Sequence, residues 1–74
     1  MSYLPCVSGR EVVRALRKIG YEFDHQSSTH IILRNNLPPF RRLSIPDHDE
    51  VAKGTLRAII RQAGLTVDEF KALL

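Results

Sequence analysis

The stretch from Thr29 to Asn35 most constrains the fold, because its β-branched and aliphatic side chains are typical of a β-strand. Just before it, residues 21–26 alternate aromatic and polar side chains, and this period of two also indicates a strand. A pair of serines between the two segments predicts a short turn. Residues 41–45 predict a third strand, which Pro46 ends. The centre of the chain therefore predicts a hairpin with a third strand beside it.

Helical patterns lie on both sides of these strands. A capping box at Ser8 predicts the start of a first helix, its apolar residues recur every three or four positions, and Gly20 predicts its end. A second helix is predicted over residues 54–63, and another capping box at Thr66 opens a short C-terminal helix. The sequence thus predicts an α+β fold of the order α-β-β-β-α, in which helices cover one face of a three-stranded antiparallel sheet.

Alternation along the second strand decides on which face its histidine lies. Ile31 and Leu33 share one face of the strand, whereas His30, Ile32 and Arg34 share the other. The helices can cover only one face of so small a sheet, and the face with two aliphatic side chains and no charge is the better core. The histidine is therefore expected on the open face.

A histidine that shares an open face with arginines is suited to RNA cleavage. The same alternation puts Arg42 of the third strand on the face of His30 and Arg34. Imidazole has an ordinary pKa of about 6.5, so it accepts and gives a proton near neutral pH. Attack of a ribose 2′-hydroxyl on the adjacent phosphate needs a base, an acid and a cation, but no metal ion. The hydroxyls of Ser28 and Thr29 are candidate ligands of the phosphate oxygens.

A lone histidine on a strand is more often a surface residue than a catalytic one, and we interpret His25 and His48 as surface residues. His48 lies between two aspartates, a setting that can suggest a metal site. Three adjacent side chains rarely converge on one ion, so we predict no metal site. The sequence also contains no glycine-rich phosphate loop, and we predict no small-molecule cofactor.

Basic residues recur along both main helices. The formal net charge of +3 is compatible with a nucleic-acid partner. Cations spaced four residues apart line one side of a helix, and such a stripe is often only the solvated side. Two stripes in one small domain favour a surface that follows phosphates. The candidate RNA-binding residues on the helices are Arg10, Arg14, Lys53 and Arg57.

Length and composition limit the protein class further. The chain has 74 residues, enough for one domain, and its one cysteine, Cys6, cannot form an intramolecular disulfide. No apolar run approaches the roughly 18 residues of a membrane-spanning helix, and the N-terminus lacks the pattern of a signal peptide. We therefore expect a cytoplasmic protein without a membrane partner.

The ordered motifs from Ser8 to Leu65 resemble the HicA (YcfA-like) family of small toxins. That family has a glycine–aromatic step after its first helix, a Gly-Ser-His element, a short strand that ends in proline, and a Lys-Gly-Thr-Leu-Arg helix. The matching segments here are, in the same order, Gly20-Tyr21, Ser28-Thr29-His30, Ser44-Ile45-Pro46 and Lys53-Gly54-Thr55-Leu56-Arg57.

The resemblance implies a fold like that of double-stranded-RNA-binding domains. We predict a single domain of this kind over residues 1–74, with a lead-in at 1–7 and a helical extension at 66–74. The resemblance implies a toxin of a type II toxin–antitoxin pair that cleaves mRNA without a metal ion, an endoribonuclease. It also implies a HicB-like antitoxin that covers the active site. His30 alone falls on a catalytic position of the family.

This chain departs from the family's Gly-Ser-His-His pattern. The glycine is Ser28, the serine is Thr29, and the second histidine is Ile31. These changes keep the proton-transfer group and alter the surroundings that bind phosphate. Two alternatives to an active enzyme therefore remain open, a non-catalytic RNA-binding module and a degenerate toxin that acts only by binding its antitoxin.

Overall fold

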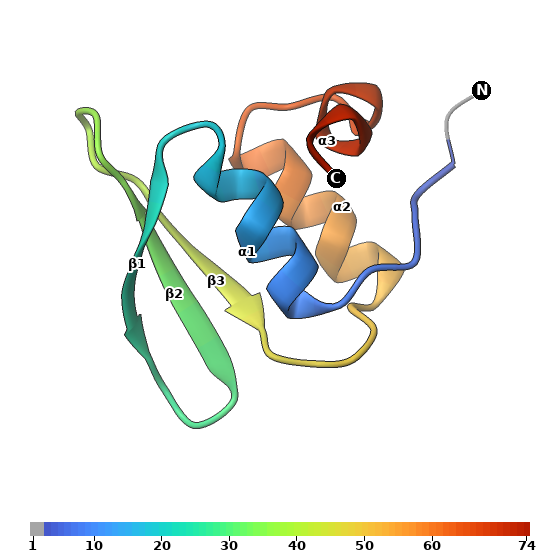
Figure 1. Ribbon diagram of the computed structural model, residues 1–74, viewed down its shortest axis with the longest axis horizontal. Helices are drawn as coiled ribbons and strands as arrows, with labels where there is room; N and C mark the ends of the chain where they lie inside the picture. The colour runs from blue at the N-terminus through green and yellow to red at the C-terminus, as the bar shows by residue number, and fades with distance from the viewer. Residues whose placement is uncertain (1–2) are drawn as a thin grey trace.

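The computed structural model describes residues 3–74, so the first two residues of the predicted lead-in lie outside the described residues. The predicted order α-β-β-β-α with a short C-terminal helix is confirmed, and it matches the double-stranded-RNA-binding-domain pattern (Figure 1). Most predicted boundaries are displaced by at most one residue, but the first helix ends at Arg17, earlier than the predicted stop at Gly20. The elements are α1 (Gly9–Arg17), β1 (Tyr21–Gln26), β2 (His30–Asn35), β3 (Arg42–Pro46), α2 (Lys53–Gln62) and α3 (Val67–Leu73).

Side-chain caps fix where two of the helices begin. The Ser8 hydroxyl accepts a hydrogen bond from the Glu11 amide, and the Glu11 carboxylate accepts one from the Ser8 amide, each at 3.1 Å. Thr66 and Glu69 make the same reciprocal pair at the start of α3. Gly20 follows α1 with φ of +100°, a left-handed conformation that glycine adopts readily. The predicted capping boxes are therefore confirmed.

The sheet is antiparallel in the order β1-β2-β3, and α1 and α2 pack against one of its faces (Figure 1). Ile31 and Leu33 are buried on that face, and His30 lies on the other, as alternation predicts. Among the described residues, no helix is long and apolar enough to cross a membrane. The core consists of Val7, Val12, Ala15, Leu16, Tyr21, Ile31, Leu33, Leu43, Ile45, Val51, Leu56, Ile59, Ile60 and Phe70.

A β-bulge interrupts β1, and simple alternation does not predict it. Phe23 is paired with Leu33, but the next pair is His25 with Ile32, so Asp24 is an extra residue on β1. Paired residues of antiparallel strands share a face. His25 therefore lies on the open face with Ile32, whereas strict alternation would put it on the helix side with Phe23. The alternation predicted over residues 21–26 is wrong beyond the bulge.

The start of α1 lies against the end of β3, and only glycine fits there. A Cβ atom on Gly9 would collide with the carbonyl oxygen of Pro46, while the Gly9 amide donates to the carbonyl oxygen of His48 at 2.9 Å. We expect Gly9→Ala to lower the free energy of unfolding by about 1–3 kcal/mol, the usual cost of overpacking. Urea unfolding followed by circular dichroism measures the change.

Gly54 provides the matched control, because it also lies in a helix but a Cβ atom there would meet nothing within 4 Å. Gly54→Ala should raise the free energy of unfolding by about 0.5–1 kcal/mol, since alanine is the better helix former. Equal effects of the two substitutions would show that the contact between α1 and β3 does not constrain the fold.

Candidate functional site

His30 begins β2 and is half-buried on the open face, at the turn of the β1–β2 hairpin. The Thr29 Oγ1 atom lies 2.9 Å from His30 Nδ1, within hydrogen-bond distance. Within the described part of the chain, no hydrogen bond or ion pair involves the other ring nitrogen, Nε2. A hydrogen bond thus holds the ring at Nδ1 and leaves Nε2 without a partner in this part of the chain.

Backbone hydrogen bonds fix the turn that carries this site. The Ser27 amide donates to the His30 carbonyl oxygen at 3.0 Å, which closes a loop of two residues, Ser28 and Thr29. The amide of Asp47, just after β3, donates to the Thr29 carbonyl oxygen at 2.9 Å. The turn is therefore tied both to its own hairpin and to the far strand of the sheet.

Serine fits the position of the family glycine without backbone strain. In residues 3–74, Phe40 is the one non-glycine residue with positive φ, so Ser28 does not adopt the left-handed conformation that favours glycine. Thr29 stands at the position of the family serine, and its hydroxyl contacts His30. Both departures from the family motif are thus compatible with the geometry of the turn.

Two predicted arginines lie on the open face with His30. Arg34 and Arg42 are direct partners in the pairing of β2 with β3, and both are exposed. Arg42 Nε lies 3.2 Å from Asp24 Oδ2, so this side chain reaches across β2 to the bulge in β1. The same oxygen of Asp24 lies 3.4 Å from His25 Nδ1. Asp24 and His25 therefore join the site, and sequence reasoning missed both.

Of the basic residues predicted on the helices, Arg10 lies at the His30 end of the sheet, because it contacts Asp47, whose amide is bonded to the Thr29 carbonyl oxygen. The other three are not gathered around His30. The four predicted to bind RNA are Arg10, Arg14, Lys53 and Arg57. They belong to α1 and α2, which pack on the opposite face of the sheet (Figure 1). Arg10 Nε lies 3.5 Å from Asp47 Oδ1, and Lys53 Nζ donates to the Leu4 carbonyl oxygen at 3.2 Å. Two of these cations thus already have partners within the protein.

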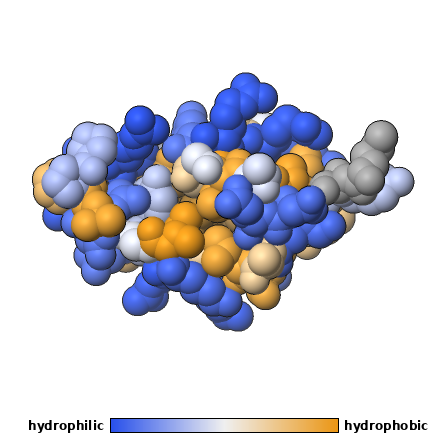
Figure 2. All heavy atoms as spheres, turned by 90° about the horizontal axis from the view of Figure 1, so that it is seen from above, coloured by the Kyte–Doolittle hydropathy of each residue, from blue (hydrophilic) through white to orange (hydrophobic). Residues whose placement is uncertain are grey.

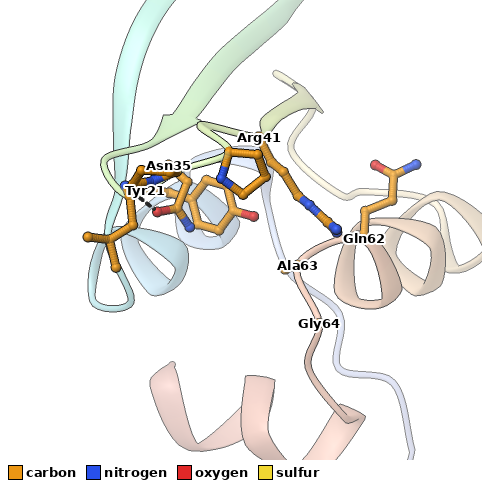
Figure 3. A pocket seen from close by; sticks show the side chains of 9 residues that line it. Tyr21, Asn35, Arg41, Gln62, Ala63 and Gly64 are labelled. Atoms are coloured by element: carbon orange, nitrogen blue, oxygen red, sulfur yellow. Dashed lines mark hydrogen bonds between the residues drawn. The ribbon is translucent and has the colours of Figure 1, made fainter.

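A separate hollow of about 350 Å³ lies at the other end of the sheet, between the β2–β3 loop and the end of α2. The Arg41 side chain extends toward Gln62 along its wall (Figure 3). Leu37 and Phe40 of the β2–β3 loop are exposed. In Figure 2, apolar atoms are visible at the left end of the molecule, where this loop lies. His30 begins β2, and Asn35, which lines the hollow, ends it. At about 3.3 Å per residue, the strand places the two about 17 Å apart.

Comparison with models of protein families gives a match. Residues 9–65 match the family described as the HicA toxin of bacterial toxin–antitoxin systems. A comparison with curated protein sequences finds no match. The matched range contains α1, the whole sheet, α2 and the turn that carries His30. Because it covers well over half of the chain, the protein belongs to the HicA family of toxins from bacterial toxin–antitoxin pairs.

Proposed function

We propose that this protein is the toxin of a type II pair and that it cleaves mRNA as a metal-independent endoribonuclease. The observation that carries the proposal is the position of His30 on the open face, with Nδ1 held 2.9 Å from Thr29 Oγ1, which leaves Nε2 for a substrate. Arg34 and Arg42 on the same face provide positive charge for a phosphate group. Such a surface site is accessible to a polymer.

In this proposal the attacking group comes from the RNA itself. The ribose 2′-oxygen attacks the adjacent phosphorus, and the bond from phosphorus to the 5′-oxygen breaks. His30 transfers a proton in this step, and the positive charge of the arginines on the same face attracts the phosphate backbone of the RNA. The hydroxyls of Ser28 and Thr29 donate to phosphate oxygens. The products are a 2′,3′-cyclic phosphate and a 5′-hydroxyl.

The partner in this proposal is a HicB-like antitoxin that covers the open face, and the complex resides in the cytoplasm. Family membership supports a toxin–antitoxin pairing. The open face carries the exposed residues Arg34, Arg42 and Ser44, which are available to another protein as well as to RNA. An antitoxin on this face would exclude RNA from His30 directly.

The test is cleavage of a structured RNA by the purified protein in a buffer that contains EDTA. We expect fragments with 2′,3′-cyclic phosphate ends, and a rate that falls as salt rises, because phosphate contacts release counterions. An RNA of the same sequence with 2′-O-methyl groups should remain intact, since it lacks the attacking hydroxyl.

Binding without cleavage would overturn the proposal and favour a non-catalytic RNA-binding module. Cleavage that requires an added metal ion would overturn the metal-independent route. Tight binding of the antitoxin with neither RNA binding nor cleavage would favour a degenerate toxin.

A further inference from the structure

We infer that His25 is the second proton-transfer group of this site, an inference that rests on the proposed function. This inference depends on the β-bulge at Asp24, because the bulge moves His25 onto the open face, where it is paired with Ile32. His30 lies two residues before Ile32 on β2, so the two histidines are diagonal neighbours on one face. Diagonal neighbours in an antiparallel pair lie about 7–8 Å apart, which leaves room for a phosphate between the rings.

The ring of His25 has a defined orientation. Its Nδ1 atom lies 3.4 Å from Asp24 Oδ2, and Arg42 Nε lies 3.2 Å from that same oxygen. The carboxylate is thus held by Arg42 of β3, and it forms an ion pair with the imidazole of β1 when that ring is protonated. The His25 side chain is 63% exposed, whereas that of Asp24 is 29% exposed. Asp24 and Arg42 are therefore positioning residues, and His25 is accessible to substrate.

The two histidines have related surroundings: His30 has a hydrogen bond at Nδ1, and His25 has a carboxylate oxygen near that atom. The oxygen atom near Nδ1 comes from Thr29 for His30 and from Asp24 for His25. Each therefore has Nε2 left to meet a substrate. A pair of imidazoles with this arrangement on one face supplies both a base and an acid, and His30 alone supplies only one of them at a time.

The proposed step balances with these two groups and no further reactant. One histidine, neutral at the start, takes the proton of the 2′-hydroxyl as the oxygen–phosphorus bond forms. The other, protonated at the start, gives its proton to the departing 5′-oxygen as its bond to phosphorus breaks. The protonation states of the pair are then exchanged, and proton transfer with water restores them. The charged and titratable groups that share this face with His25 are Glu22, Asp24, His30, Arg34 and Arg42.

The first test compares two exposed histidines. We expect His25→Ala to cleave RNA about 10²–10⁴-fold more slowly than the parent, the usual contribution of a general acid or base. His48→Ala is the matched control, because His48 is exposed in the connector between β3 and α2 and is outside the site. It should cleave within twofold of the parent rate. Thermal unfolding should be the same for both variants.

The second test separates proton transfer from a merely structural role. The RNA is synthesised with sulfur in place of the 5′-oxygen at the position where the parent cleaves. A thiolate leaves without a proton, so this substrate removes the need for the acid but not for the base. We expect it to restore the rate of one variant and only one, either His25→Ala or His30→Ala. Restoration of both or of neither would overturn the division of roles.

A double-mutant cycle tests the positioning of the ring. Asp24→Asn should slow cleavage in the parent but have no further effect in the His25→Ala background, because its role runs through that ring. Additive effects would overturn the positioning role. If the parent cleaves RNA and His25→Ala does so equally fast, the inference fails while the proposed function stands. If the parent does not cleave RNA, the proposed function itself fails.

Discussion

Replacing His30 with alanine should abolish RNA cleavage and the growth inhibition that follows it, while the fold stays intact. The side chain lies on the open face, and Thr29 is its hydrogen-bond partner, so its loss opens no cavity in the core. General acid–base catalysis contributes about 10²–10⁴-fold to a rate, and this is the loss we expect. Initial rates from a gel assay and the midpoint of thermal unfolding measure the two effects separately.

Two comparisons make this result specific. His30→Gln keeps a polar side chain of similar reach but cannot exchange a proton in this step, so it should be as inactive as the alanine variant. Both variants should still bind a HicB-like antitoxin, because the rest of the open face is unchanged. A variant of either kind that cleaves RNA at the parent rate would remove His30 from the mechanism and require another group to take its place.

Local patterns along the chain predict most of the fold. Capping boxes predict where α1 and α3 begin, because their hydrogen bonds join residues that are only three positions apart. The prediction therefore does not depend on contacts between distant residues. Alternation along β2 likewise reports the buried Ile31 and Leu33 and the outward His30, because successive side chains of a strand take opposite faces. These features are local, and the sequence alone is sufficient to predict them.

The bulge in β1 is a feature that local alternation does not predict. An inserted residue changes the face of every side chain after it, yet the sequence Phe23-Asp24-His25 still alternates between aromatic and polar types. The pairing with β2 and the reach of Arg42 to Asp24 decide the register, and both are contacts between distant residues. Alternation along β1 therefore cannot place His25 on the face of His30.

The basic stripes illustrate a second limit. Helical periodicity tells which side of a helix is solvated, but not how that side faces relative to the sheet. Arg14 and Arg57 are exposed, as their spacing predicts, but they lie on helices that cover the opposite face of the sheet from His30. RNA contacts at these positions would need a polymer that passes around the edge of the domain. Their role in RNA binding stays a prediction.

The family match ends at residue 65, but the hydrophobic core does not. Phe70 of α3 has no exposed surface and belongs to the same cluster as the buried residues of α1, α2 and the sheet. The Lys18 side chain donates to the Leu73 carbonyl oxygen at 2.7 Å, which joins the end of α1 to α3. The helical extension predicted for residues 66–74 is thus packed into the structure.

Phe70→Ala should therefore destabilise the protein more than any change on the open face. Removal of a buried phenylalanine side chain costs about 3–5 kcal/mol. At about 0.05–0.15 kcal/mol per residue, a chain of 74 residues has a free energy of unfolding of about 4–11 kcal/mol. The substitution would remove a large part of it. Urea unfolding measures the change. Phe40 is 49% exposed and its ring centroid lies 5.6 Å from Arg34 Cζ, so Phe40→Ala should cost only about 1 kcal/mol or less.

The two kinds of inactive variant should then differ in how they recover. Phe70→Ala loses activity because much of the protein is unfolded, so an osmolyte such as trimethylamine N-oxide, which favours burial, should restore both the fold and cleavage. His30→Ala is already folded, so the same osmolyte should leave it inactive. If Phe70→Ala proved as stable as the parent, burial of the Phe70 side chain would not contribute to the free energy of unfolding, and the expected role of α3 in the core would be wrong.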